Sequence, residues 1–319
     1  MASLTVIVPN YNHAKYLPES LDSILRQTRP AEELIVIDDA STDDSAAVIR
    51  SKLHNVRYAR FEQNVRNVGY IASVNRLIGT VRSDVLFFAS ADDVFYPSLF
   101  EIGMNLLEQH PAAALFSARS DLIDAKGERR QFNTPVPITA PGYIGPAAAA
   151  RFLLRDDSWF MGNVSLYRRD KFMAAGGLSE DLGAFADGYL ARVLALRYGA
   201  CFTPQVLGGW RRLDSGMAME HVHKIAKADA VIESIKSRME HSGAPFPPGY
   251  AGRWGGRQLF GLHRTAVLSR MRASSGLRRF WLAVWGSVKI ARLFIALRPQ
   301  DVVPVMRRRA AAVVRSIFS

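Results

Sequence analysis

Cysteine is almost absent from this sequence, which has one cysteine in 319 residues. A single thiol, Cys201, excludes an internal disulfide and any metal cluster built from several cysteines. This usage fits a reducing compartment, so we expect a cytoplasmic protein. The N-terminus also lacks a basic region and a cleavage site of small residues before the apolar run Leu4 to Val8, and we therefore expect no signal peptide.

Acidic residues are scarce in the C-terminal part of the chain. From Arg264 to the end there are twelve Arg or Lys residues and one acid, Asp301, which together account for +11 of the net charge of +12. The basicity is therefore a property of the tail, and the rest of the chain is close to neutral. A stretch rich in Pro, from Ala244 to Gly249, marks a boundary before this tail. We predict an N-terminal domain over residues 1–242 and a basic, mostly helical extension over residues 243–319.

The tail also lacks a long apolar stretch that is free of charge. Phe280 to Leu297 carries Lys289 and Arg292 near its middle, and each costs about 2.5–3.5 kcal/mol at the centre of a bilayer. A spanning helix is thus disfavoured, and we favour helices that lie on an anionic membrane surface, peripherally on the inner face of the membrane. Packing of these helices on the domain, or in a homodimer, is the alternative. We expect no nucleic-acid partner, because no recognition motif accompanies the charge.

Short apolar runs alternate with amphipathic segments in the first half of the chain, which is typical of strands joined by crossover helices. This predicts an α/β fold with a mixed, mostly parallel, Rossmann-like sheet flanked by helices. Asp124 to Pro146 is predicted as a loop. The predicted strands are Leu4–Val8, Leu34–Ile37, Val56–Phe61, Val85–Phe88, Ala112–Phe116 and Val164–Tyr167. The predicted helices are Lys15–Gln27, Thr42–Leu53, Val68–Thr80, Pro97–Gln109 and Gly188–Leu196.

Polar residues follow three of the predicted strands directly, in the segments Pro9 to Asn12, Asp38 to Ser41 and Ala89 to Asp93. In an open α/β sheet, ligands bind beyond the carboxyl ends of the strands. Each segment taken alone is also an ordinary turn, because Asn, Asp and Ser often cap helices. Two acidic pairs on one edge of a sheet, however, need a cation or hydrogen-bond donors nearby. Asp92 with Asp93 is therefore our candidate for a Mg²⁺ or Mn²⁺ site.

The order and spacing of these blocks over residues 4–97 resemble the family 2 glycosyltransferases, which have the GT-A fold. Val6 to Asn12 resembles the opening strand of that family, and Ile35 to Asp43 resembles its second strand and acidic turn. Asn67 to Gly69 with Asn75, and the aspartates near position 92, are similar to its third and fourth blocks. The resemblance implies a nucleotide-diphosphate sugar as donor, with a preference for uridine, and a saccharide or lipid-linked acceptor.

Carried over by position, the resemblance gives roles to individual donor-site residues. It places Tyr11 against the nucleotide base, Asp39 on a hydrogen-bonding edge of that base, and Pro9 in the turn between them. Asn67 is also expected to bind the donor. Asp92 and Asp93 take the metal and diphosphate motif, in which Ser90 stands where the family has its first carboxylate.

Later segments resemble the acceptor side of the same family. Gly176 to Glu180 is similar to its Gly-Gly turn, and Asp187 occupies the position of its catalytic base, preceded by Ala186 where the family has Glu. An N-cap of the following helix is the other interpretation of Asp187, and the two roles are compatible. Trp210 to Arg212 is similar to an aromatic-Arg segment, in which Arg211 or Arg212 is expected to bind diphosphate. A solvated Arg pair is the alternative there.

These residues predict a transfer reaction that requires stabilisation of the leaving group and removal of a proton from the acceptor. A metal at Asp92 and Asp93 would stabilise the departing nucleoside diphosphate, and Asp187 would take the proton of the acceptor hydroxyl. The resemblance implies an inverting, metal-dependent hexosyl- or related transferase, acting in the synthesis of surface polysaccharide or glycolipid. The alternative is a non-catalytic nucleotide-sugar-binding or scaffold protein of the same fold, suggested by Ser90 and Ala186. A nucleotidyltransferase is disfavoured, because no Gly-rich, basic loop follows the first strand.

Overall fold

The computed structural model of the chain describes residues 1–157, 159–213 and 225–272. The chain divides into two compact units, one formed by residues 1–152 and 158–213 and the other by residues 153–157 and those from 214 onward. All of the predicted site residues lie in the first unit, which is an α/β domain.

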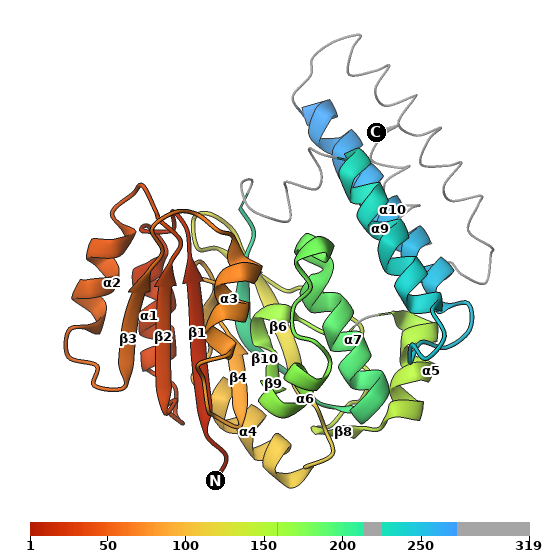
Figure 1. The fold of residues 1–319 in the computed structure, drawn as a ribbon, viewed down its shortest axis with the longest axis horizontal. Helices are drawn as coiled ribbons and strands as arrows, with labels where there is room; N and C mark the ends of the chain where they lie inside the picture. The colour runs from red at the N-terminus through yellow and green to blue at the C-terminus, as the bar shows by residue number, and fades with distance from the viewer. Residues whose placement is uncertain (158, 214–224, 273–319) are drawn as a thin grey trace. The chain divides into compact units, whose positions relative to one another are not determined.

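The first unit is built on one mixed sheet with the strand order β3-β2-β1-β4-β9-β6-β10-β5, in which β7 also pairs with β6 and β8 with β10 (Figure 1). Neighbouring strands among β1 to β4 pair in parallel, as do β6 and β10, whereas β9 runs antiparallel between β4 and β6. The strands are β1 (Leu4–Asn10), β2 (Glu33–Asp38), β3 (Ala59–Gln63), β4 (Val85–Phe88), β5 (Val94–Phe95), β6 (Leu115–Ile123), β7 (Arg129–Arg130), β8 (Gly142–Ile144), β9 (Leu166–Arg168) and β10 (Ala200–Arg211). The predicted fold class is confirmed.

Helices cover both faces of this sheet (Figure 1). On one face α1 (Leu17–Leu25), α2 (Ser45–Leu53) and α4 (Leu99–Gln109) share a core with alternate residues of the central strands, among them Val6, Val36 and Phe87. On the other face lie α3 (Tyr70–Ile78) and α6 (Arg169–Ala174), where the ring of Phe172 is 5.4 Å from that of Phe88. The unit also contains α7 (Ala186–Tyr198), the short 3₁₀ helices η1 (Gly162–Val164) and η2 (Glu180–Phe185), and the first part of α5 (Pro146–Asp156), whose residues from 153 onward belong to the second unit.

The central strands are buried on both faces, which determines where polar chemistry can occur. Val6, Ile7 and Val8 of β1 are all fully buried, and so are the apolar residues of β2. A strand covered on both sides reads as a continuous apolar run without a polar face. The apolar runs of β1, β2 and β4 give way to polar side chains at the carboxyl ends of these strands, and the site forms at that edge.

Several element boundaries differ from the predicted ones for local reasons. The first helix begins at Leu17 rather than Lys15, with Pro18 in its first turn, where proline is tolerated. The third helix begins at Tyr70, because Gly69 has φ 92° and cannot be helical. The prediction of a loop over Asp124 to Pro146 is wrong in part, since this segment contains β7 and β8, short strands that pair with β6 and β10.

The second unit contains α9 (Ile225–Glu240) and α10 (Tyr250–Arg272). Asp157 belongs to this unit. Its carboxylate accepts a 2.6 Å hydrogen bond from the Tyr250 hydroxyl and forms a 3.1 Å ion pair with Arg257. The predicted boundary after residue 242 falls between α9 and α10 and stays a prediction. The predicted tail helices beyond residue 272 lie outside the described residues. Among the helices of the described ranges, none has the length and apolar character needed to cross a membrane.

Candidate active site

The carboxyl ends of β1 and β2 are joined by a buried hydrogen-bond network. Asn10 and Asp38 are paired across the two strands, and the Asn10 Nδ2 donates to Asp38 Oδ1 at 2.7 Å. The backbone N–H of Ser41 donates to the other oxygen of Asp38 at 3.0 Å. Asp38 is fully buried, so its carboxylate holds the turn after β2 together. The next residue, Asp39, is thereby fixed at the edge of the sheet.

Asp39, predicted to bind the base, holds the loop that precedes α3. Its Oδ1 accepts hydrogen bonds from Asn64 Nδ2 at 2.8 Å and from the Val68 N–H at 2.9 Å, and its Oδ2 accepts from the Gly69 N–H at 2.7 Å. A carboxylate oxygen can accept about two hydrogen bonds. Among the described residues, Oδ2 therefore has one acceptor position left. This position suits an N–H of a ligand.

The other predicted donor-site residues are more open to solvent. The Tyr11 side chain follows β1 and is 44% exposed, which is unusual for a tyrosine beside a buried network. Asn67 is exposed in the loop held by Asp39. Pro9 does not lie in a turn as predicted, because β1 continues to Asn10 and pairs Pro9 with Ile37 of β2. An exposed aromatic ring next to a buried acceptor is a typical arrangement for binding a planar polar ligand.

Asp92 and Asp93 follow β4 but have different surroundings. Asp93 is 1% exposed, and its Oδ1 accepts the backbone N–H of Arg211 at 2.7 Å. Burial, and then the neighbouring charge of Asp92, raises its pKa well above the ordinary range. Asp92 is only partly buried, and burial raises its pKa although the charges of His13 and Arg211 oppose the rise. Asp92 is thus the more accessible residue of the pair, and Asp93 ties the β4 turn to the end of β10.

Arg211, predicted to bind diphosphate, is buried at the centre of a network of protein groups. Its Nε donates to the carbonyl of Asp92 at 2.7 Å, and its two terminal nitrogens reach the carbonyl of Asp124 at 3.0 Å and Glu19 at 2.6 Å. The guanidinium also lies 4.8 Å from the centre of the Tyr16 ring. The neighbouring Arg212 is exposed. The contacts that the structure gives Arg211 therefore hold the Asp92 turn in place, and diphosphate binding stays a prediction.

Asp187, the predicted base, is the second residue of α7. Its Oδ1 accepts the N–H of Gly188 at 2.6 Å, and a side chain on Gly162 would begin 2.7 Å from its Oδ2. The residue has an exposed side, but its carboxyl is crowded by protein, and this loss of hydration raises its pKa. Burial, with the charge of Asp187 nearby, also raises the pKa of Tyr70 and Tyr167. A carboxylate with a raised pKa at a helix start is suited to act as a general base.

The sequence matches the model of the family named Glycosyl transferase family 2 over residues 5–174. The chain belongs to this family. The matched stretch runs from β1 to the end of α6 and so includes Asp39, Asp92 and Asp93.

Curated relatives of this glycosyl transferase family 2 chain are distant. An uncharacterised protein of Mycobacterium tuberculosis is 25% identical over 210 residues, which cover 64% of this chain and 65% of the relative. An uncharacterised glycosyltransferase of Rickettsia felis is 30% identical over 135 residues, which cover 41% of this chain and 22% of the relative. The matched part thus spans less than two thirds of the length of these relatives.

Solved structures with the GT-A fold cover most of the family 2 chain. A mannosyltransferase from Pyrobaculum calidifontis, in complex with GDP-Man and Mn²⁺, aligns with a TM-score of 0.61 and 20% identity over 99% of this chain and 87% of that one. Residues 1–349 of S. aureus TarS, in complex with UDP-GlcNAc, align with a TM-score of 0.63 and 15% identity over 91% and 81% of the two chains. At these identities the likeness establishes the fold.

Two residues near Asp92 were not predicted from the sequence. His13 is close enough for its charge to act on the Asp92 carboxyl, and Tyr16 lies beneath the guanidinium of Arg211. Both precede α1, where the only signal in the sequence was the turn after the first strand. Their approach to Asp92 depends on the pairing of β1 with β4, which no local pattern reveals.

The fit of a divalent metal in this family 2 site can be judged from the oxygen ligands available. In the described part of the chain, no group of three or more His, Cys, Asp or Glu side chains is arranged to hold a metal ion. Mg²⁺ and Mn²⁺, however, often bind through one or two carboxylates together with substrate phosphates. The partly exposed Asp92 fits that mode, in which most of the remaining ligands would come from the donor and water.

Proposed function

We propose that this chain is a glycosyltransferase that moves a sugar from a nucleotide-diphosphate sugar to an acceptor hydroxyl with inversion. The observation that carries the proposal is the arrangement at one edge of the sheet. The exposed ring of Tyr11 and the open acceptor position of Asp39 follow β1 and β2, which are adjacent strands, and Asp92 follows β4 on the other side of β1. Along this edge, Asp39 and Tyr11 are suited to bind the nucleotide base, and Asp92, next in order, is suited to bind the metal and the diphosphate.

The chemistry follows from the positions of the two acidic sites. When bound at Asp92, a Mg²⁺ or Mn²⁺ ion supplies electrostatic stabilisation of the leaving diphosphate. Asp187 accepts the proton of the acceptor hydroxyl as the oxygen attacks the anomeric carbon, and the Gly188 N–H holds the carboxylate in position. A single displacement of this kind needs one base and no protein nucleophile, which fits inversion.

Asp39 favours uracil or guanine as the base of the donor. Both bases present a ring N–H on the edge that faces away from the sugar, whereas cytosine and adenine present an unprotonated ring nitrogen there. A carboxylate oxygen accepts hydrogen bonds and repels a second acceptor. The solved mannosyltransferase and TarS were studied with GDP-Man and UDP-GlcNAc respectively, which agrees with this selectivity.

A nucleotide screen by thermal unfolding is the direct test of the donor site. With Mn²⁺ present, we expect UDP or GDP to raise the unfolding temperature more than ADP or CDP does at the same concentration. A ligand at one hundred times its Kd stabilises the folded state by about 2.7 kcal/mol. Equal shifts with all four nucleotides would contradict the role given to Asp39.

Tyr11 provides the matched variants for this screen. Tyr11→Ala removes the ring and is expected to weaken binding of the favoured nucleotide about 5- to 150-fold, because stacking on a base contributes about 1–3 kcal/mol. Tyr11→Phe keeps the ring and should bind like the wild type. Hydrolysis of the matching nucleotide sugar, without an acceptor, then separates an enzyme from a non-catalytic binding protein.

Peripheral contact with an anionic membrane through the C-terminal extension is part of the proposal. It is supported by the sequence pattern of residues 264–319, where basic and large apolar residues alternate. The full chain is expected to sediment with vesicles that contain an anionic lipid, and a chain ending at residue 242 is expected to remain in the supernatant. Binding should weaken with salt, because exposed charges are screened. Absence of binding at low salt would favour packing or a homodimer.

A further inference from the structure

The side chain of Asn75 forms a clamp on a backbone segment far away in the sequence. Its Nδ2 donates to the carbonyl of Leu178 at 2.7 Å, and its Oδ1 accepts the N–H of the same residue at 3.3 Å. The two residues are 103 positions apart. One amide side chain on α3 thus satisfies both polar backbone groups of Leu178, and Leu178 is only 4% exposed. Buried backbone groups need such partners.

The clamp holds a turn that has little freedom to change. Gly176 and Gly177 have φ values of 91° and 69°, a conformation that residues with a side chain rarely adopt. A side chain at Gly177 would begin 3.4 Å from Asn75 Oδ1, so the turn already fits closely against the amide. From this turn the chain passes through η2 and reaches Asp187 at the start of α7. The anchored Leu178 is nine residues before that carboxylate.

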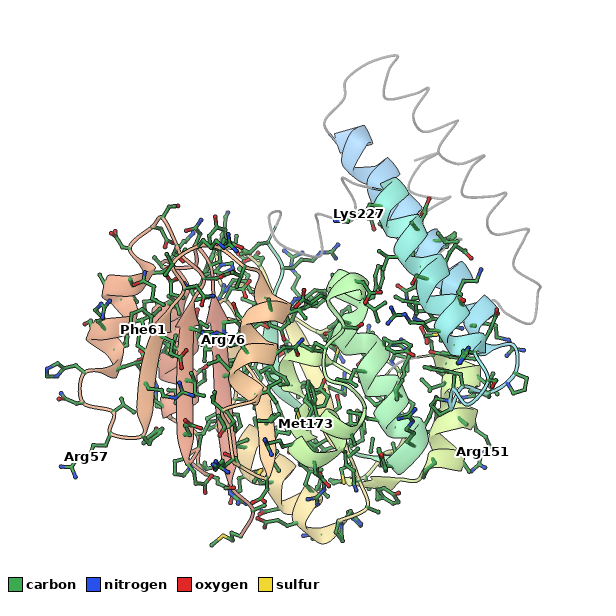
Figure 2. All side chains as sticks on the ribbon, in the orientation of Figure 1. Arg57, Phe61, Arg76, Arg151, Met173 and Lys227 are labelled. Atoms are coloured by element: carbon green, nitrogen blue, oxygen red, sulfur yellow. The ribbon has the colours of Figure 1, made fainter. Side chains whose placement is uncertain are left out.

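The same helix is fixed at its other end by the donor site. Asp39 accepts the backbone N–H groups of Val68 and Gly69, which immediately precede α3. Asn75 lies in the last part of this nine-residue helix, next to Arg76, which marks the place in Figure 2. Side-chain hydrogen bonds thus anchor α3 just before its first residue and again in its last part. α3 therefore connects Asp39, at the edge proposed to bind the nucleotide base, with the segment that carries Asp187, the proposed general base.

We propose that Asn75 is a positioning residue, which fixes the segment from Gly176 to Asp187 and so places the carboxylate of Asp187 for proton transfer. The inference rests on the proposed glycosyltransferase function. Asn75 touches neither donor nor acceptor in this role. It acts through Leu178, and its loss leaves Asp187 chemically intact but less well placed.

The experiment measures donor binding and catalysis separately, with water as the acceptor. Isothermal titration gives the Kd of UDP and of GDP with Mn²⁺, and hydrolysis of UDP-GlcNAc and GDP-mannose gives kcat and KM. In Asn75→Ala, we expect the nucleotide Kd to stay within about twofold of the wild type and kcat to fall by about 10- to 100-fold, as displacements of about 1 Å in a site do. A merely structural residue would lower both together, along with the unfolding temperature.

Two further variants guard against a folding defect. Asn75→Asp keeps the acceptor for the Leu178 N–H and places an oxygen against the Leu178 carbonyl, so it should also lower kcat with an unchanged Kd. Asn105→Ala, at an exposed Asn on α4, is the matched control and should behave like the wild type. Unchanged kcat in both Asn75 variants, or a proportional loss of nucleotide affinity, overturns the inference alone. A wild type that neither binds nor hydrolyses any donor overturns the proposed function and this inference with it.

Discussion

Replacing Asp92 with Asn is expected to lower metal-dependent turnover of the donor by about 10³-fold or more while the protein stays folded. Asp92 is partly exposed and follows β4 at the edge where the diphosphate is proposed to bind, and its backbone carbonyl is held by Arg211. An amide has nearly the same volume but no charge for the metal. Stabilisation of the leaving group by a metal contributes several kcal/mol, and each 1.36 kcal/mol is tenfold in rate. Activity measured as Mn²⁺ is titrated, with thermal unfolding of the same samples, tests this.

Asp93→Asn is the matched comparison, which tests whether the metal depends on the charge of Asp92 or on that of Asp93. Asp93 is buried, and its Oδ1 accepts the Arg211 N–H, a bond that an Asn oxygen can keep. We therefore expect it to retain turnover within about tenfold of the wild type, at a similar metal concentration. Equal losses in the two variants would mean that both carboxylates hold the metal. Full activity of Asp92→Asn would remove the metal site from this edge of the sheet.

Replacing Asp187 with Asn is expected to lower kcat by about 10²- to 10⁴-fold, the usual contribution of a positioned base, with the nucleotide Kd unchanged. Gly162→Ala provides an independent variant that keeps the carboxylate. Its new methyl group would lie 2.7 Å from Asp187 Oδ2, so the carboxylate must turn away. A loss of kcat in both variants, with binding intact, assigns the effect to the position of the carboxylate. A parallel loss of nucleotide affinity would instead identify Asp187 as a structural cap of α7.

The raised pKa of Asp187 adds a pH dependence with a definite sign. A general base works when deprotonated, so kcat should rise with pH through a pKa above the ordinary range of Asp, and this limb should vanish in Asp187→Asn. Because the folded state binds this proton more tightly than the unfolded chain, ionisation of Asp187 lowers stability as the pH rises through the two pKa values. Near neutral pH, Asp187→Asn should therefore unfold at the same temperature as the wild type or higher.

Sequence reasoning found the residues that follow strands and missed the contacts that strands create. Asp39 and Asp92 were predictable as site candidates, because a run of apolar residues that ends in acids indicates a strand end at the ligand edge. The different surroundings of Asp92 and Asp93 were not, since these depend on how the turn after β4 meets the end of β10. Arg211 was predicted to bind diphosphate. Its burial could not be predicted, because it follows from the pairing of β10 with β6 and β5. The clamp of Asn75 on Leu178 joins residues that are 103 positions apart in the sequence, so no local pattern could reveal it.

The antiparallel strand β9 also constrains the order in which this domain can assemble. Only the two-residue strand β5 lies between β4 and β6 in the sequence, yet these two strands are separated in the sheet by β9, which comes later in the chain. The sheet therefore stays divided into an N-terminal part, β1 to β4, and a later part until residues 166–168 have been synthesised and inserted. Contacts between residues so far apart form slowly, and unpaired strand edges promote association with other chains in the meantime. Until β9 is in place, β4 and β6 each keep an unpaired edge, which favours aggregation of the nascent chain.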